Sequence, residues 1–130
     1  KYDEFEKVFI QLSFTKKESP TNVKTKYIIN KINCYYEGRE IFDDEGSVEH
    51  IIPESDKTSS IGNLILLERN INFKADDKSY KDKIIDYSDS KYKWVGKFVK
   101  EHNDWTTDDI NSRAVEMAKI YFYKILGRSK

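Results

Sequence analysis

The stretch "SVEHIIPES", from Ser47 to Ser55, decides how this sequence is interpreted. Its apolar, β-branched residues and its proline are typical of a short buried strand that ends at the proline. Yet Glu49 and His50 occupy its middle, in a chain with only 2 histidines. Burying a carboxylate and an imidazole costs free energy unless both find partners. The pair therefore indicates either a satisfied polar pair in the core or a site that performs chemistry.

A second apolar run, "LILLE" from Leu64 to Glu68, follows after the polar loop "ESDKTSSIGN". Two short apolar runs joined by a polar loop predict a strand, a loop and a strand. From Arg69 the pattern becomes helical and rich in lysine up to about Tyr87. The centre of the chain is thus predicted to be a strand–strand–helix unit.

Helical periodicity flanks this unit on both sides. Upstream, a helix is predicted over about 2–13, with the apolar residues Tyr2, Phe5, Phe9 and Leu12. A second helix is predicted to be capped at Thr21 or Asn22 and to end at Gly38, with the apolar residues Val23, Tyr27, Ile28, Ile32 and Tyr35. Downstream, helices are predicted around 94–99 and from Thr107 to Gly127. We expect one α+β, mostly helical domain over 1–130, with a helical N-terminal segment over 1–46, a core of about 47–87 and C-terminal helices over 91–127.

Composition narrows the classes of function. Hydrophobic residues make up 38% and aromatic residues 14%, which excludes a disordered chain. Lys plus Arg and Asp plus Glu both number 23, so the net charge is zero, whereas nucleic-acid binders are usually basic. Any binding of nucleic acid must therefore depend on the local distribution of charge.

A single cysteine, Cys34, excludes an internal disulfide and a zinc site built from cysteines. It is expected to pack as a small apolar residue, and the reducing cytoplasm is the expected location. No run approaches the roughly 18 apolar residues of a membrane span, and no signal peptide is visible. The absence of an initiating Met leads us to expect a domain cut from a longer protein.

The chemistry is concentrated in a short span that holds Glu49, His50, Asn63, Asn70 and Asn72, followed by Lys74. Hydrolysis of a phosphodiester needs a base for water, a cation and oxygen ligands for that cation. Neutral histidine, with a pKa near ~6.5, can accept a proton at cellular pH. Mg²⁺ keeps several waters, so one carboxylate and one asparagine carbonyl can hold it.

The ordered motifs "VEHIIP" and "IGNLILL", followed by Asn72, resemble the core of HNH, or His-Me finger, nucleases. The closest resemblance is to the C-terminal HNH domain of GmrSD-type restriction endonucleases, over about Ser47 to Ile125, with weaker support from "TKYIINKI" upstream. Further matching positions are Tyr80, Lys83, Tyr87, Ser90, Trp105, Ile110 and Arg113. The resemblance implies a ββα-metal unit, in which two antiparallel strands and a helix hold one divalent metal, surrounded here by helices.

The same resemblance implies a role for each residue. His50 would be the general base, Asn72 a metal ligand on the helix, and Asn63 the residue that holds the loop and the histidine in place. Glu49 stands where many HNH enzymes have an Asp metal ligand, and the metal would be one Mg²⁺ or Mn²⁺ ion. Because neighbours on a regular strand point to opposite faces, Glu49 and His50 can share a site only if the strand end is twisted or irregular.

Contacts with nucleic acid are expected from Lys74, Lys78, Lys83 and Arg113. Other interpretations stay open: 8 lysines against 5 aspartates over 74–100 are also typical of a solvated helix face. Asn72 could cap a helix and Asn63 could belong to a turn. Arg113 could form a structural ion pair instead.

These features together predict a Mg²⁺-dependent DNA endonuclease that serves as effector of a larger prokaryotic restriction or phage-defence protein. The resemblance implies an N-terminal nucleotide-hydrolysing sensor domain or subunit as partner and no membrane association. Because the net charge is zero, affinity of this domain for DNA should be weak and salt-sensitive. Two alternatives are an RNA-directed or nonspecific nuclease, such as a toxin, and a non-catalytic helical interaction module.

Overall fold

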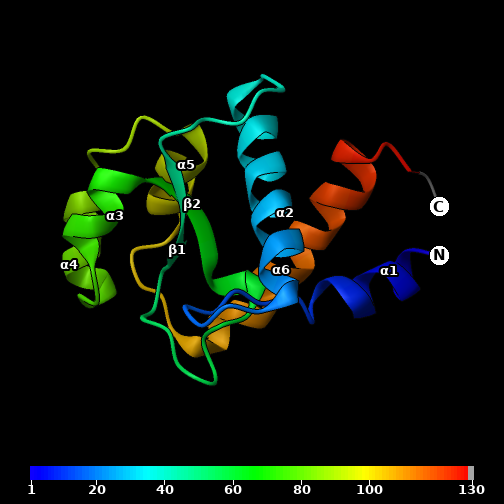
Figure 1. Ribbon diagram of the computed structural model, residues 1–130, viewed down its shortest axis with the longest axis horizontal. Helices are drawn as coiled ribbons and strands as arrows, with labels where there is room; N and C mark the ends of the chain where they lie inside the picture. The colour runs from blue at the N-terminus through cyan, green and yellow to red at the C-terminus, as the bar shows by residue number, and fades with distance from the viewer. Residues whose placement is uncertain (129–130) are drawn as a thin grey trace.

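The computed structural model describes residues 1–128, which form helices around a two-stranded antiparallel sheet (Figure 1). The elements are α1 (Tyr2–Phe9), α2 (Pro20–Glu37), β1 (Gly46–His50), the 3₁₀ turn η1 (Ile61–Asn63), β2 (Leu64–Glu68), α3 (Arg69–Ala75), α4 (Tyr80–Tyr87), α5 (Lys93–Glu101), α6 (Thr107–Lys119) and the π-helical turn η2 (Ile120–Ile125). The predicted α+β, mostly helical class is confirmed.

The strands pair so that Gly46 lies opposite Glu68 and His50 lies opposite Leu64. β2 has the predicted bounds, whereas β1 ends at His50 rather than at the proline. The reason is that the chain after β1 bonds to a single residue instead of a strand: the Ile51 and Ile52 amides donate to the main-chain and side-chain oxygens of Asn63, at 2.9 and 3.0 Å. Because α3 follows β2 directly, the strands and this helix form a ββα unit.

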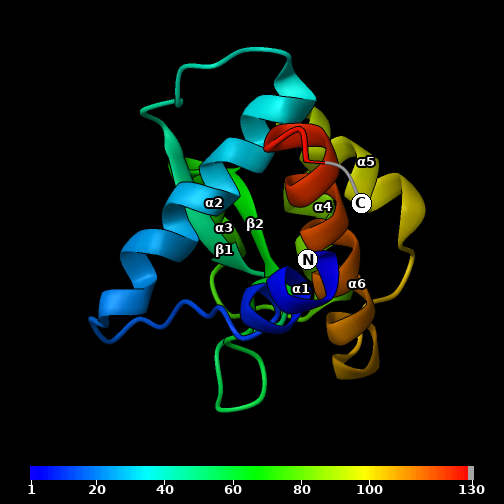
Figure 2. The same ribbon diagram turned by 90° about the vertical axis from the view of Figure 1, so that its right-hand side faces the viewer.

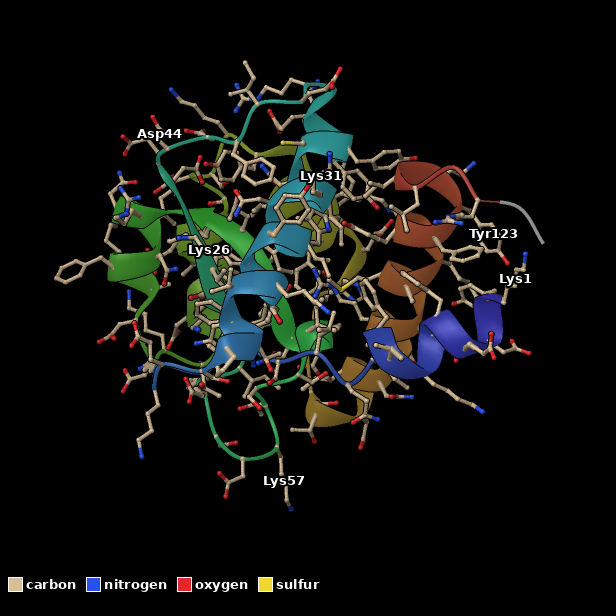
Figure 3. The ribbon with its side chains drawn as sticks, turned by 45° about the vertical axis from the view of Figure 1, so that its right-hand side comes forward. Lys1, Lys26, Lys31, Asp44, Lys57 and Tyr123 are labelled. Carbon is tan, nitrogen blue, oxygen red and sulfur yellow. The ribbon has the colours of Figure 1, made fainter. Side chains whose placement is uncertain are left out.

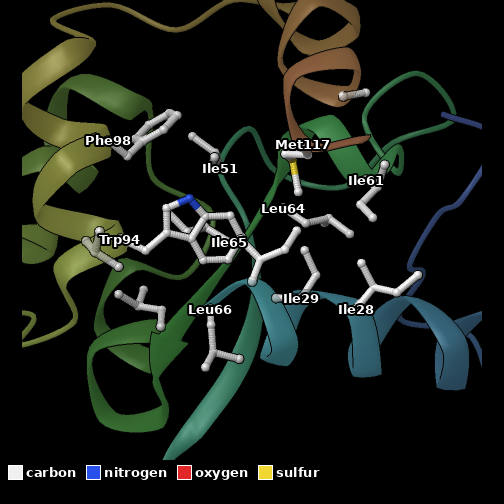
Figure 4. Close-up of a cluster of buried hydrophobic side chains, with 14 of the residues drawn as sticks. Ile28, Ile29, Ile51, Ile61, Leu64, Ile65, Leu66, Trp94, Phe98 and Met117 are labelled. Carbon is white, nitrogen blue, oxygen red and sulfur yellow. The ribbon is translucent and has the colours of Figure 1, made fainter. Parts of the chain in front are cut away.

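The core surrounds β2, which lies between α2 on one side and α5 on the other (Figures 1 and 2). Residues of both strand faces are buried, with Leu64 and Ile65 at 0% exposure, because helices cover the sheet on both sides. Trp94 and Phe98 of α5 and Ile29 of α2 approach this strand from opposite sides (Figure 4). Burial on both faces fixes β2, and through its pairing fixes β1.

Helix α2 departs from its expected start and face. It begins at Pro20, which suits the first helical position because proline's missing N–H has no partner there anyway. The expectation that Val23, Tyr27 and Tyr35 join an apolar stripe is wrong, since they are 76%, 51% and 43% exposed. The buried face is rotated and consists of Thr25, Ile28, Ile29, Asn30, Ile32, Asn33 and Cys34.

The helical pattern predicted over 69–87 is divided into α3 and α4. The break lies at Asp76, whose φ of 44° places it in the left-handed region that disfavours residues other than glycine. The chain reverses there, and α4 packs against α3 with Tyr80, Lys83 and Tyr87 on its buried face. This reversal brings α4 side chains to the end of β1.

The N-terminal helix packs on the C-terminal helical segment, where Tyr2 stacks on Tyr123 at 5.3 Å between ring centroids. Figure 3 shows Tyr123 beside Lys1, and Lys57 at the tip of the loop that follows β1. Cys34 is buried, as predicted. Among residues 1–128, no helix is both long and apolar enough to cross a membrane.

Candidate functional site

A cleft of about 230 Å³ opens between the end of β1 and the end of α3. It contains three residues of the predicted site, since His50, Glu49 and Asn72 all line it. The remaining lining residues are Phe14, Lys16, Val48, Pro53, Glu54, Phe73, Asp76 and Asp77. Glu49 and His50 can both reach the cleft because β1 ends at His50 and the chain bends there.

The imidazole of His50 has a defined orientation. Its Nε2 lies 2.6 Å from the carbonyl oxygen of Phe14, which can only accept, so Nε2 carries the proton. Nδ1 is then the unprotonated nitrogen, and it has no hydrogen-bond partner among residues 1–128. Burial lowers the pKa of His50 below its usual value near 6.5, although the Phe14 carbonyl and Glu54 oppose the shift. The ring is therefore a neutral base at cellular pH.

The carboxylate of Glu49 is held by two donors from α4. Its Oε2 accepts from Lys83 Nζ at 2.9 Å and from the Tyr87 hydroxyl at 2.5 Å. Lys83 also donates to the His50 carbonyl oxygen at 2.7 Å, so one ammonium group joins both residues of the pair. Burial raises the pKa of Glu49, while Lys83 and Tyr87 act in the opposite direction. Burial and the nearby carboxylate raise the pKa of Tyr87 well above its usual value, which keeps its hydroxyl a donor.

Asn72 is fixed to β1 through its amide nitrogen. Nδ2 donates to Ser47 Oγ at 2.9 Å and to the Val48 carbonyl oxygen at 3.1 Å. These two bonds assign the amide orientation, and the carbonyl oxygen Oδ1 has no donor within the described portion of the chain. Asn72 thus presents an oxygen in the cleft that contains His50. Asn70 is exposed on the same helix and does not line the cleft.

Asn63 is fully buried and lies outside the cleft lining. Its Nδ2 donates to the carbonyl oxygens of Ile52 and Thr58, both at 2.8 Å. Its Oδ1 accepts from the Ile52 amide at 3.0 Å and from Trp105 Nε1 at 3.2 Å. With all of these bonds made, the side chain fixes the loop that leaves β1 immediately after His50.

Two of the four predicted DNA contacts are wrong. Lys83 has 0% exposure because it serves Glu49. Arg113 is also buried, where its Nη1 donates to the carbonyl oxygens of Gly62 and Leu64 at 2.9 and 2.7 Å, and it forms no ion pair with any of residues 1–128. Its guanidinium lies 4.9 to 5.9 Å from the ring centroids of Phe98, Trp94 and Trp105. Burial lowers the pKa of Arg113 to about 10.

The other two predicted contacts remain available to a ligand. The side chains of Lys74 and Lys78 are 57% and 45% exposed. Each lies near a carboxylate, with Lys74 Nζ 3.7 Å from Asp89 and Lys78 Nζ 2.9 Å from Asp86. Their contact with nucleic acid stays a prediction.

Sequence reasoning missed the partners that hold the site. The positions Tyr80, Lys83 and Tyr87 follow one another at spacings of three and four, which puts the lysine on a buried face that needs a carboxylate. That pattern could have paired Lys83 with Glu49. Phe14 offered no comparable indication, because its contribution is a main-chain carbonyl 36 residues away from His50.

The donor atoms around the cleft suit a hard cation. No three His, Cys, Asp or Glu side chains of residues 1–128 form a group that could hold a metal. Mg²⁺ does not require such a group, because it is held by one or two protein oxygens and several waters. Asn72 Oδ1 and the second carboxylate oxygen of Glu49 are free of hydrogen bonds from the described residues, and Asp76 and Asp77 add carboxylates to the lining. The residues present therefore fit a magnesium-type ion.

Residues 1–120 match the family described as GmrSD restriction endonucleases, C-terminal domain. No curated protein matches the chain. The matched range contains the ββα unit and every residue that lines the cleft, so the predicted resemblance to this family is confirmed. The chain belongs to the family of C-terminal domains of GmrSD restriction endonucleases, and is by that membership a nuclease domain.

Proposed function

We propose that residues 1–130 form a single HNH endonuclease domain that hydrolyses DNA with a divalent metal and with His50 as general base. The observation that carries the proposal is the shared cleft, in which a neutral His50 with a free Nδ1 lies with the free carbonyl oxygen of Asn72. If Glu49 and His50 only stabilised the core, a third residue with a free oxygen atom, Asn72, would not be expected in the same cleft.

His50 Nδ1 accepts the proton of the attacking water. The Phe14 carbonyl accepts from Nε2–H, which selects the reactive tautomer and stabilises the imidazolium that forms. A well-placed general base contributes roughly 10²–10⁴-fold to rate. This corresponds to about 3–5 kcal/mol of barrier.

Charge in the cleft favours a cation as cofactor. Four carboxylates line it, from Glu49, Glu54, Asp76 and Asp77, and only Lys16 of the lining and the Lys83 ammonium group bound to Glu49 offset them. An anionic phosphodiester would be repelled from such a surface unless a cation neutralised it. The acidic lining therefore supports a metal-dependent reaction.

Asn72 Oδ1 and the free oxygen of Glu49 would hold one Mg²⁺ or Mn²⁺ ion. Such an ion would neutralise charge on the phosphate and on the leaving 3′ oxygen. Attack by the water breaks the bond between phosphorus and the 3′ oxygen, which takes a proton from solvent, so the products are a 5′ phosphate and a 3′ hydroxyl. Lys83 and Tyr87 orient Glu49, and Asn63 orients the chain that follows His50. These three residues act by positioning rather than by contact with the substrate.

In this proposal the exposed lysines Lys74 and Lys78 contact backbone phosphates beside the cleft. The domain acts as the DNA-cutting effector of a prokaryotic cytoplasmic restriction or phage-defence protein. An N-terminal nucleotide-hydrolysing sensor domain or subunit recognises the target and delivers the DNA. A neutral effector suits such a partner, because tight DNA binding by the effector alone would release it from control.

The test compares His50→Ala with His102→Ala, which alters the only other histidine. His102 packs on Phe98 and Trp105 outside the cleft and serves as the matched control. We expect His50→Ala to lower the rate of DNA cleavage by roughly 10²–10⁴-fold while thermal unfolding stays cooperative. His102→Ala should keep the wild-type rate, and EDTA should abolish cleavage by both.

The substrate panel contains double-stranded DNA, single-stranded DNA and RNA. Cleavage of RNA alone would replace the DNA assignment with an RNA-directed nuclease. If His50→Ala cleaved as fast as wild type, the general-base role would be refuted. Absence of cleavage by the wild-type domain, together with loss of stability in His50→Ala, would favour the interaction module.

A further inference from the structure

Phe73 is the most exposed large apolar side chain among residues 1–128, at 86% exposure. It follows Asn72 on α3 and lines the same cleft as His50. Leaving a phenyl ring in water forgoes the free energy that its burial would release. Single exposed apolar side chains are common, but among the large exposed ones of residues 1–128 Phe73 is distinguished by its position at the cleft of the predicted site.

Helix geometry explains why the ring cannot turn inward. Ile71 and Ala75, four positions apart on one face of α3, take the buried side and are 6% and 0% exposed. Phe73 lies halfway between them in sequence and therefore on the opposite side of the helix, about 200° around the axis from Ile71. The ring projects from the cleft wall and has no place in the core.

The surroundings of the ring match one nucleotide of a nucleic-acid strand. The Cα atoms of Phe73 and Asn72 are about 3.8 Å apart, as for any trans peptide. In the proposed function a cation at Asn72 Oδ1 would bind the scissile phosphate, and the base attached to that phosphate would then lie within reach of the phenyl ring. Lys74, the next residue, and Lys16 on the facing loop supply positive charge for the flanking phosphates.

We propose that Phe73 stacks on the base next to the scissile phosphate, so that this domain selects DNA whose base is already unstacked. This inference rests on the proposed nuclease function and names its substrate class: single-stranded, mismatched or locally opened DNA. A base in an intact duplex is stacked on both faces and cannot accept the ring without being unstacked. Removing an aromatic side chain that stacks on a base weakens single-strand binding roughly 5-fold to 150-fold.

The experiment measures binding rather than cleavage, using the His50→Ala domain with Mg²⁺. The probe is a single-stranded oligonucleotide of about 10 nucleotides that carries 2-aminopurine, whose fluorescence is quenched by stacking. Phe73→Ala and Phe73→Trp are introduced into this background. The control is Ile85→Ala, which removes another exposed apolar side chain, 68% exposed on α4 and outside the cleft.

We expect Phe73→Ala to weaken single-strand binding by roughly 10-fold and to lose the quenching, whereas Phe73→Trp and Ile85→Ala keep both. Affinity for an intact duplex should be the same with and without Phe73→Ala. The stacking role would be overturned if Phe73→Ala weakened binding to single and double strands equally, or if it left single-strand binding unchanged. Absence of binding by the parent domain would overturn it as well. Because the ring is exposed, unfolding curves of these variants should superimpose.

The outcomes separate this inference from the proposed function. Quenching that depends on Phe73, together with unaltered cleavage by His50→Ala, would leave a base-stacking surface on a protein whose mechanism is different. Metal-dependent cleavage that needs His50, without any effect of Phe73→Ala on binding, would refute the stacking role alone.

Discussion

At the scale of single residues, the polar pair of β1 is tolerated because each member has a buried partner. Lys83 is the most important of these partners, since its ammonium group donates hydrogen bonds to both the Glu49 carboxylate and the His50 carbonyl oxygen. We expect Lys83→Met to lower the free energy of unfolding by about 3–5 kcal/mol, because it leaves a buried carboxylate without its counter-ion. Urea denaturation followed by circular dichroism measures the change.

The double variant Glu49→Gln with Lys83→Met tests whether the charge is the cause. It removes both charges, so it should recover a large part of the loss that Lys83→Met produces alone. Lys97→Met is the control, because Lys97 pairs with Glu101 on the surface and is 45% exposed. That variant should change stability by only about 0.3–0.5 kcal/mol. A similar loss in Lys83→Met and Lys97→Met would contradict the buried ion pair.

The pH dependence of cleavage follows from the environment of His50. Only the neutral ring accepts a proton, so kcat/KM should fall as pH drops through the pKa of His50 in the free enzyme. Burial lowers that pKa, which places the midpoint of the acidic limb below the usual 6.5. Glu54 acts against this shift, with Oε1 3.9 Å from Nε2, so Glu54→Gln should move the midpoint lower still. A wild-type midpoint above 6.5 would show that burial does not dominate.

Residue types along the sequence predicted which polar residues share the cleft better than they predicted the burial of charge. The Glu49–His50 pair and Asn72 could be picked out because their residue types are unusual in an apolar strand and ordered along the chain. Lys83 and Arg113 were assigned to DNA because a basic residue is usually exposed. Both occupy buried faces of helices, and the helical spacing of their apolar neighbours contains that information.

At the scale of elements, the contact between η1 and α6 depends on one missing side chain. A Cβ atom at Gly62 would lie 2.0 Å from the main-chain carbonyl oxygen of Ile110, so no larger residue fits. We expect Gly62→Ala to lower the free energy of unfolding by at least about 2 kcal/mol, because the helix backbone must move. Thermal unfolding measures the effect.

The same substitution at Gly96 should have the opposite sign. Gly96 lies inside α5, and a Cβ atom there would meet nothing within 4 Å. Alanine favours the helical backbone over glycine by about 0.5–1 kcal/mol. Gly96→Ala should therefore raise the free energy of unfolding. Destabilisation by both substitutions would show that the close approach at Gly62 is not what distinguishes the two sites.

Elements with a strong local pattern could be predicted, whereas breaks imposed by tertiary packing could not. The bounds of β2 and the start of α6 follow from an apolar run and from a capping box at Thr106 and Asp109. The division between α3 and α4 depends on the left-handed backbone of Asp76. No glycine or proline near this position indicates a break in the helix. The rotated face of α2 follows from its packing against β2 and α5, which is long-range information.

At the scale of the whole molecule, the cleft joins segments that are far apart in sequence. The connection between α1 and α2 provides Phe14 and Lys16, the strand provides His50, and the helix after β2 provides Asn72. The ββα unit alone would leave the imidazole without the acceptor that selects its tautomer. In the proposed mechanism the helical N-terminal segment therefore contributes to the site, which would explain why the ββα unit is surrounded by helices.

The charge of the whole molecule governs its affinity for duplex DNA. With 23 basic and 23 acidic residues the net charge is zero, and the cleft lining is acidic, so we expect binding to depend on a cation and on local lysines, namely Lys16, Lys74 and Lys78. We expect a dissociation constant weaker than about 10⁻⁵ M at physiological salt for the His50→Ala domain with Mg²⁺. The contacts of Lys74 and Lys78 with phosphates together contribute about −1.8 to the slope of log affinity against log salt.

The decisive comparison is between removal of these lysines and removal of the metal. The double variant Lys74→Gln with Lys78→Gln should reduce the magnitude of the salt slope by about 1.8, whereas Lys97→Gln on α5, whose side chain lines a different pocket, should leave the slope unchanged. EDTA should weaken binding of the parent domain, because Glu54, Asp76 and Asp77 then face the phosphate with only Lys16 of the lining to offset them, Glu49 being paired with Lys83. Nanomolar binding in EDTA would mean that a basic surface other than the cleft holds DNA. A domain with that property would not need a partner to bring its substrate, and the effector role proposed above would fail with it.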